Sequence, residues 1–114
     1  MRFEARELKD YAEPVSPDQL QVGKVYFSVI FLDKDGHVPN VEPRVFVGPK
    51  VDPEGTKLYF QDFASYQRGI RFDSPEADEE ATFVTGAGRY IFEYERALDV
   101  LMNCALRRRK NDPT

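Results

Sequence analysis

The last quarter of the chain carries a helical pattern, which constrains the fold more than any other feature of the sequence. Apolar residues recur there at spacings of three and four, as Tyr94, Ala97, Leu98, Leu101, Cys104 and Ala105. This spacing places them along one side of a helix. The basic run Arg107–Lys110 would then lie at the negative end of the helix dipole. We predict a helix over about Phe92 to Arg109 that packs its apolar stripe onto the rest of the domain.

The strongest strand signal is Lys24–Asp33 (KVYFSVIFLD), which is rich in β-branched and aromatic residues. Its alternation gives two apolar faces. One face holds Val25, Phe27, Val29 and Phe31, and the other holds Tyr26, Ile30 and Leu32. A strand that is apolar on both faces is typical of the middle of a sheet. We therefore predict a central strand covered on each side, on one of them by the C-terminal helix.

Turn residues divide the next part of the chain. Lys34-Asp35-Gly36 has the composition of a hairpin turn, since Gly adopts a positive φ without strain. A second strand is predicted at Arg44–Val47, and Pro39 and Pro43 indicate an edge strand or an irregular beginning. A third strand is predicted at Lys57–Gln61.

A short helix is predicted at Phe63–Arg68, with Asp62 as its N-cap and Gly69 closing it in the left-handed conformation. Two further strands are predicted, at Ile70–Phe72 and Ala81–Thr85, on either side of an acidic loop at Asp73–Glu80. Gly86 and Gly88 would form a joint after the second of them. Arg89–Phe92 either completes the sheet or begins the terminal helix.

The chain of 114 residues has the size of one domain, 1–114. Residues 1–15 are predicted to be a loosely attached arm, and 110–114 a disordered tail. Ser16-Pro17-Asp18-Gln19 has the pattern of a capping box at the start of a helical turn that ends near Gly23.

The predicted fold class is α+β: a small antiparallel sheet of about five strands, with an amphipathic C-terminal helix packed on it and a short helix near 63–68. Leu20–Tyr26 (LQVGKVY), which runs into the long strand, resembles the start of SH3-like barrels. The resemblance covers seven residues and implies an open barrel, without implying a function.

Cysteine content and the N-terminus bear on the compartment. Cys104 is the only cysteine and falls within the helical pattern, so one chain can form neither a disulfide nor a multi-cysteine zinc site. Met1–Asp10 has no apolar run of the signal-peptide type, and no segment reaches membrane-spanning length. We expect a cytoplasmic protein with no membrane contact, no metal and no cofactor.

Charge is distributed unevenly along the chain. The net charge is −4, and residues 107–114, with four basic residues and one acid, carry +3, which leaves −7 for residues 1–106. An acidic body repels a phosphate backbone, so nucleic acid is an unfavoured partner. A second hypothesis is that the basic end of one chain meets the acidic loop Asp73–Glu80 of another, which would give a salt-sensitive homodimer.

Motifs with catalytic potential are incomplete. His37, the only histidine, follows the hairpin turn, and neither Ser28 nor Ser65 is marked as its nucleophile, so we interpret it as a solvent-exposed loop residue. Asp33 and Asp35 have the first spacing of a calcium loop but lack the closing Glu. An enzyme is therefore not the expected class.

Aromatic residues suggest a binding surface. Tyr59, Phe63, Tyr66, Arg68 and Arg71 combine aromatic and basic side chains within a short stretch. The leading hypothesis is a non-catalytic interaction domain that uses this surface to contact a protein partner or a second copy. The alternatives are a small-ligand or enzymatic pocket between helix and sheet, with Asp62, Tyr66 and Arg68 as polar groups, and single-stranded nucleic-acid binding.

Overall fold

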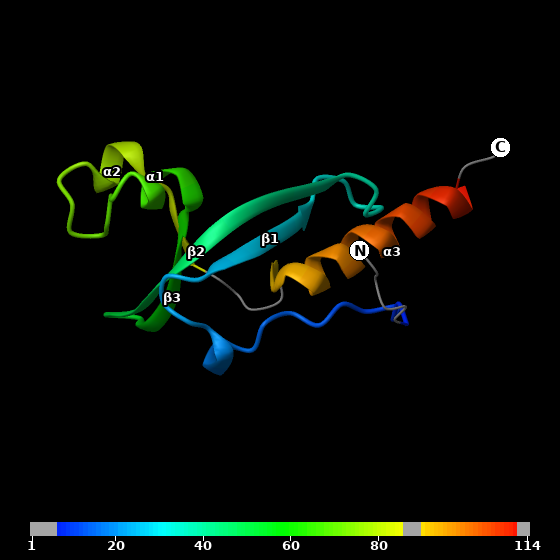
Figure 1. Cartoon of the computed structure of the whole chain (residues 1–114), viewed down its shortest axis with the longest axis horizontal. Helices are drawn as coiled ribbons and strands as arrows, with labels where there is room; N and C mark the ends of the chain where they lie inside the picture. Colours follow the sequence, from blue (N-terminus) through cyan, green and yellow to red (C-terminus); the bar gives the residue numbers. More distant parts are fainter. Residues whose placement is uncertain (1–6, 86–89, 112–114) are drawn as a thin grey trace, which may run out of the picture.

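A computed structural model describes residues 7–85 and 90–111 (Figure 1). Its elements are the 3-10 turn η1 (Pro17–Gln19), strands β1 (Val25–Phe31), β2 (Pro39–Asp52) and β3 (Gly55–Asp62), helices α1 (Phe63–Gln67) and α2 (Ala77–Glu80), strands β4 (Phe83–Thr85) and β5 (Ile91–Phe92), and helix α3 (Tyr94–Asn111). The strands form one antiparallel sheet in the order β4-β3-β2-β1-β5. The predicted α+β class, with a five-stranded sheet and a C-terminal helix, is confirmed.

The β1–β2 hairpin has the turn that the sequence predicts. Gly36 adopts a φ of +70°, and Asp33 shapes the turn by accepting hydrogen bonds from the backbone N–H groups of His37 and Val38 at 2.8–3.1 Å. These bonds favour the ionised carboxylate and hold the pKa of Asp33 below its usual range, the bond from Val38 contributing most. The hairpin is therefore fixed by local chemistry.

Strand β2 differs from the prediction of a short strand at Arg44–Val47. It runs for 14 residues, lies in the middle of the sheet and contains both Pro39 and Pro43. The backbone N–H and C=O groups of Phe46 bond to the chain just before β1. Because these groups point to alternate sides along a strand, those of the odd-numbered residues 39–45 point away from β1. Pairing with β3 begins at Arg44, so the two prolines face a side without a paired strand. The two prolines thus correctly indicate a stretch that is paired on one side only, but the prediction of an edge strand is wrong for β2 as a whole.

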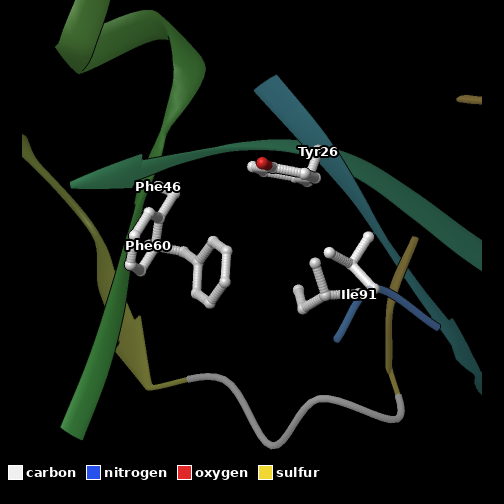
Figure 2. Close-up of a cluster of buried hydrophobic side chains, with 5 residues drawn as sticks. Tyr26, Phe46, Phe60 and Ile91 are labelled. Carbon is white, nitrogen blue, oxygen red and sulfur yellow. The ribbon is translucent and has the colours of Figure 1, made fainter. Parts of the chain in front are cut away.

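The sheet curls around an apolar core. Tyr26, Phe46, Phe60 and Ile91, from four strands, meet on its concave face together with Val15, and all five are buried (Figure 2). The Tyr26 and Phe60 rings meet edge to face, with their centroids 6.4 Å apart. A bulge between Phe46 and Gly48 marks where β2 changes register. This core fixes the end of the sheet farther from α3.

Helices cover the opposite face of the sheet in two places (Figure 1). Near α3, Phe27 and Val29 of β1 pack against Phe92 and Ala97. At the other end, the segment with α1 and α2 folds over β3. On the concave face, the far end of β1 remains open, and Ile30 is exposed. The prediction that β1 is covered on both sides thus holds only for its first half.

Two predictions between β3 and β4 are wrong. Ile70–Phe72 does not form a strand, because the Ile70 N–H donates to the Ser65 carbonyl and the Ile70 carbonyl accepts from the buried Gln61 side chain. The acidic segment contains the short helix α2. As predicted, Asp62 caps the beginning of α1, and Gly69 follows its end with a positive φ.

Residues 7–24, the described part of the chain before β1, follow the body and form no regular structure apart from η1. Ala12 and Val15 are buried, and the Val15 N–H donates to the Ile91 carbonyl at 2.9 Å. The Ser16 side chain does not cap η1 and instead donates to Asp18, so the predicted capping box is absent. Residues 1–6 lie outside the described part of the chain.

The C-terminal helix α3 lies beside the β1–β2 hairpin (Figure 1). It starts at Tyr94, and Ile91–Phe92 pair with β1, so these two residues complete the sheet rather than begin the helix. Lys110 and Asn111 belong to the helix rather than to the predicted tail. Residues 112–114, and Gly86 to Arg89 with the predicted glycine joint, lie outside the described residues.

Candidate interaction surface

Four of the five residues predicted as a binding surface contact other parts of their own chain. Tyr59, on β3, packs edge to face on Phe72, with ring centroids 5.1 Å apart, and Phe72 stacks on Phe83 at 4.4 Å. Lys50 Nζ lies 5.0 Å from the centroid of the Phe72 ring. Tyr59 thus belongs to an intramolecular aromatic cluster. Phe63, on α1, is 39% exposed.

Tyr66 and Arg71 form a separate pair. The Arg71 guanidinium carbon lies 3.7 Å from the centroid of the Tyr66 ring, and Nη1 donates to the carbonyls of Tyr66 and Ile70. Arg68 points toward α2, where Nη2 donates to the Glu80 carbonyl at 3.0 Å. The structure thus brings together two of the five residues, Tyr66 and Arg71. The guanidinium groups of Arg68 and Arg71 hold the segment between β3 and β4 together.

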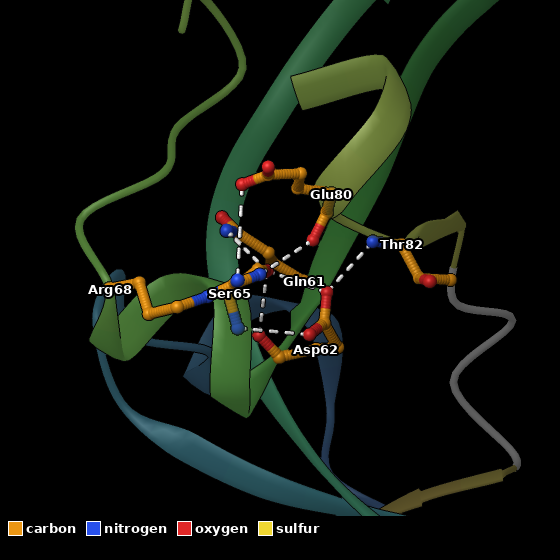
Figure 3. A network of polar contacts seen from close by, with 6 residues as sticks. All are labelled: Gln61, Asp62, Ser65, Arg68, Glu80 and Thr82. Atoms are coloured by element: carbon orange, nitrogen blue, oxygen red, sulfur yellow. Dashed lines mark hydrogen bonds and ion pairs between the residues drawn. The ribbon is translucent and has the colours of Figure 1, made fainter. Parts of the chain in front are cut away.

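Asp62 organises the polar network beside this pair (Figure 3). It accepts hydrogen bonds from the Ser65 N–H (3.0 Å), the Ser65 hydroxyl (2.6 Å) and the Thr82 N–H (2.7 Å). Burial raises the pKa of Asp62, but these bonds together outweigh burial, so the pKa lies below its usual range. Gln61, fully buried, donates to Ser65 Oγ at 2.9 Å. The network attaches α1 to the end of β3.

Ser65, His37 and Cys104, which the sequence offered as nucleophile or base candidates, lie in structural contacts within the described part of the chain. His37 is half-buried in the hairpin turn, rather than solvent-exposed as predicted, and its carbonyl oxygen lies 3.6 Å from Cys104 Sγ. Cys104 is buried, and its thiol also lies 3.4 Å from the Gly36 carbonyl. The Ser65 hydroxyl donates to Asp62. Cys104 thus packs the hairpin turn against α3, as a structural contact.

The body-facing side of α3, which we call its inner face, carries small and polar residues. At about 100° of rotation per residue, Ala97, Val100, Cys104 and Arg107 fall on this side. Ala97 and Cys104 are buried, and Arg107 donates to the Gly36 carbonyl through Nη2 (2.7 Å) and Nε (3.3 Å). Asn103 Nδ2 donates to the Lys9 carbonyl at 2.9 Å. Polar anchors therefore fix the orientation of the helix.

The opposite side of α3, its outer face, carries the large apolar residues. Tyr94 is 69% exposed, Leu98 48%, Met102 49% and Leu106 42%. The prediction that the apolar stripe packs on the body is thus wrong for Leu98, and it holds for Ala97 and Cys104. Tyr94 remains largely exposed, but its ring also packs edge to face on Phe27 of β1, with centroids 5.3 Å apart. At the areas typical of large side chains, four such residues expose several hundred Å², about the size of the largest apolar patch on a typical soluble monomer, which is often functional.

A groove extends the outer face toward the sheet. It has a volume of about 150 Å³ and lies between α3 and the hairpin, and its lining is apolar: Phe27, Val41, Tyr94, Ala97, Leu98 and Leu101. Asp62, Tyr66 and Arg68, the polar groups predicted for a ligand pocket, lie at the other end of the sheet (Figure 1). The groove therefore suits an apolar side chain better than a polar ligand.

Sequence reasoning missed this surface although its signal is in the chain. Tyr94, Leu98, Met102 and Leu106 recur at every fourth position, beside the line of Ala97, Val100 and Cys104. With two apolar lines, the apolar part of the helix surface is wider than the single stripe that a helix needs to pack on one neighbour. That excess is the signal of the exposed outer face.

Comparison of the chain with protein-family models, with curated proteins and with solved structures finds no match. Within residues 7–85 and 90–111, no three His, Cys, Asp or Glu side chains are grouped so that they could hold a metal ion. No helix in the same ranges is both long and apolar enough to cross a membrane.

Proposed function

We propose that this chain is a non-catalytic protein-interaction domain that binds its partner through the outer face of α3 and the adjoining groove. The observation that carries the proposal is the orientation of α3. Its small and polar residues face the body, and Leu98, Met102 and Leu106 face outward. Burying one large apolar side chain is worth about 1.5–3 kcal/mol, so covering this face favours association.

The free edge of β2 favours helix pairing over strand addition. A partner strand would need backbone donors along residues 39–43, and Pro39 and Pro43 have no N–H to offer. Proline on an edge is a common protection against strand pairing. A helix that lies along α3 needs no backbone partner, and its apolar side chains fit a groove.

Polar side chains elsewhere support a non-catalytic role. Asp62, Ser65 and Arg71, which sequence reasoning considered as reactive or binding groups, make hydrogen bonds that cap α1 or close the segment between β3 and β4. Each of them has a structural partner that a substrate would have to displace. A substrate-binding role would therefore weaken the fold at this end of the sheet.

Site-specific photo-crosslinking in living cells tests the proposal. A photoreactive phenylalanine analogue replaces Leu98 in one variant and Val51 in a control, since Val51 is also exposed but lies on the far half of β2. We expect a discrete intermolecular adduct at position 98 and none at position 51. Equal labelling at the two positions, or an adduct between position 98 and residues 1–6 of the same chain, would contradict the proposal.

A further inference from the structure

We infer that the partner of the outer face is a second copy of this chain, with the two α3 helices packed antiparallel about a two-fold axis. This inference rests on the proposed function and names its partner. Leu98, Met102 and Leu106 are evenly spaced, so the row reads the same from either end. A two-fold axis at Met102 places Leu98 of each copy near Leu106 of the other, and Glu95 of each copy level with Arg109 of the other. Self-complementarity of this kind is the requirement for an isologous interface.

The charge along α3 selects the antiparallel direction. The first turn of the helix holds the acidic Glu95, and its last turn holds Arg108, Arg109 and Lys110, whereas the charge of Glu93 is already paired with Lys24 of the same chain at 2.8 Å. Antiparallel packing brings Glu95 of each copy to the basic end of the other helix, and it aligns the two helix dipoles in opposite directions, which is favourable. Parallel packing would place the two basic ends side by side. Electrostatic complementarity therefore specifies the orientation, as at other interfaces.

Glu95 and Arg109 are the charges best placed to cross the interface. At 100° per residue, both fall within about 60° of the direction of Leu98, on the outer face. Both are exposed. Within one helix they are 14 residues apart, about 21 Å at 1.5 Å per residue, too far for direct contact. Any energetic coupling between them must therefore come from a second chain.

A charge-reversal cycle, followed by sedimentation equilibrium of the full chain, tests the inference. The variants are Glu95→Arg, Arg109→Glu and the double variant, with Leu98→Asp to remove the apolar contact. We expect a wild-type dimer, a monomeric Leu98→Asp, and association weakened about five- to tenfold by each single reversal. The double variant should return to within about threefold of the wild type, since opposite charges face each other again.

The outcomes separate this inference from the proposed function. A wild-type chain that is monomeric at every concentration overturns the homodimer, whereas a crosslink from position 98 to another protein would still support the interaction domain. Single reversals without recovery in the double variant overturn the antiparallel arrangement. Circular dichroism establishes that each variant is folded, and Met102→Glu replaces Leu98→Asp if the latter is not.

Discussion

Gly36 connects the hairpin turn to α3 through its backbone. Its carbonyl accepts from Arg107 Nη2 at 2.7 Å and lies near Cys104 Sγ. Its φ of +70° is one that residues with a side chain adopt with strain, and a Cβ at this position would lie 3.1 Å from Arg107 Nη2. A single residue thus serves the turn and the helix contact together.

We predict that Gly36→Ala lowers the free energy of unfolding by about 1–2 kcal/mol, mostly through left-handed strain. Urea unfolding measures the effect. Gly69→Ala is the matched control, because Gly69 also has a positive φ while a Cβ there meets no atom within 4 Å. If the two variants lose the same free energy of unfolding, the contact between the new Cβ at position 36 and Arg107 contributes nothing to the loss.

Asp62 links stability to pH. Because its folded pKa is lowered, its ionised form stabilises the fold above the unfolded pKa, and this contribution is lost as the pH falls through the folded pKa. We predict that Asp62→Asn lowers Tm at neutral pH, and that the difference from the wild type shrinks below about pH 4. Thermal melts between neutral pH and about pH 3 measure it, with Asp35→Asn as a control for the lost charge. A difference that is constant with pH would argue against the ionised cap.

At the scale of elements, α3 has two faces with opposite roles. Ala97 is buried against Val29 and Phe92, and the adjacent Leu98 is on the outer face. The two residues are neighbours on one helix, so they share local propensity and differ in what they contact.

We predict that Ala97→Asp unfolds the domain or costs at least about 3 kcal/mol, because it buries an unpaired charge. Leu98→Asp should change the stability of the monomer by less than about 1 kcal/mol, since its position faces solvent. Chemical denaturation at a concentration below dimerisation compares the two. Similar losses of stability for the two variants would show that the outer face also packs on the body.

Across the whole molecule, β1 joins two apolar clusters. Tyr26 points into the concave core, and Val29 points from the other face toward α3. The molecule is elongated, with extents of 53 × 32 × 30 Å, so the two clusters lie along its length and share a strand. A shared strand couples their stability.

We predict a single cooperative unfolding transition. Far-UV circular dichroism, which reports mainly on α3, and near-UV dichroism of the tyrosines should give coincident midpoints. Phe60→Leu, in the concave core and remote from α3, should shift both midpoints together by a destabilisation of about 1–2 kcal/mol. A helix signal that stays at its wild-type midpoint would show that the two clusters unfold separately.

The sequence by itself determined the features that depend on neighbouring residues. Alternation placed β1, Asp35-Gly36 placed the turn, Asp62 and Gly69 bounded α1, and the apolar spacing placed α3 to within two residues at each end. Turns, caps and periodicity act within a few residues, so they can be read from the chain.

Only the tertiary structure decided which way α3 faces and how long β2 becomes. Periodicity shows that a helix has an apolar side but not which side meets the body, and here Asn103 and Arg107 find their hydrogen-bond partners only when the large apolar residues face outward. Pro43 is tolerated in a central strand because the pairing of β2 with β3 begins one residue later, at Arg44. Ile70 leaves the sheet because the buried Gln61 side chain takes its carbonyl. In each case the deciding contact lies elsewhere in the chain, where local sequence patterns carry no signal.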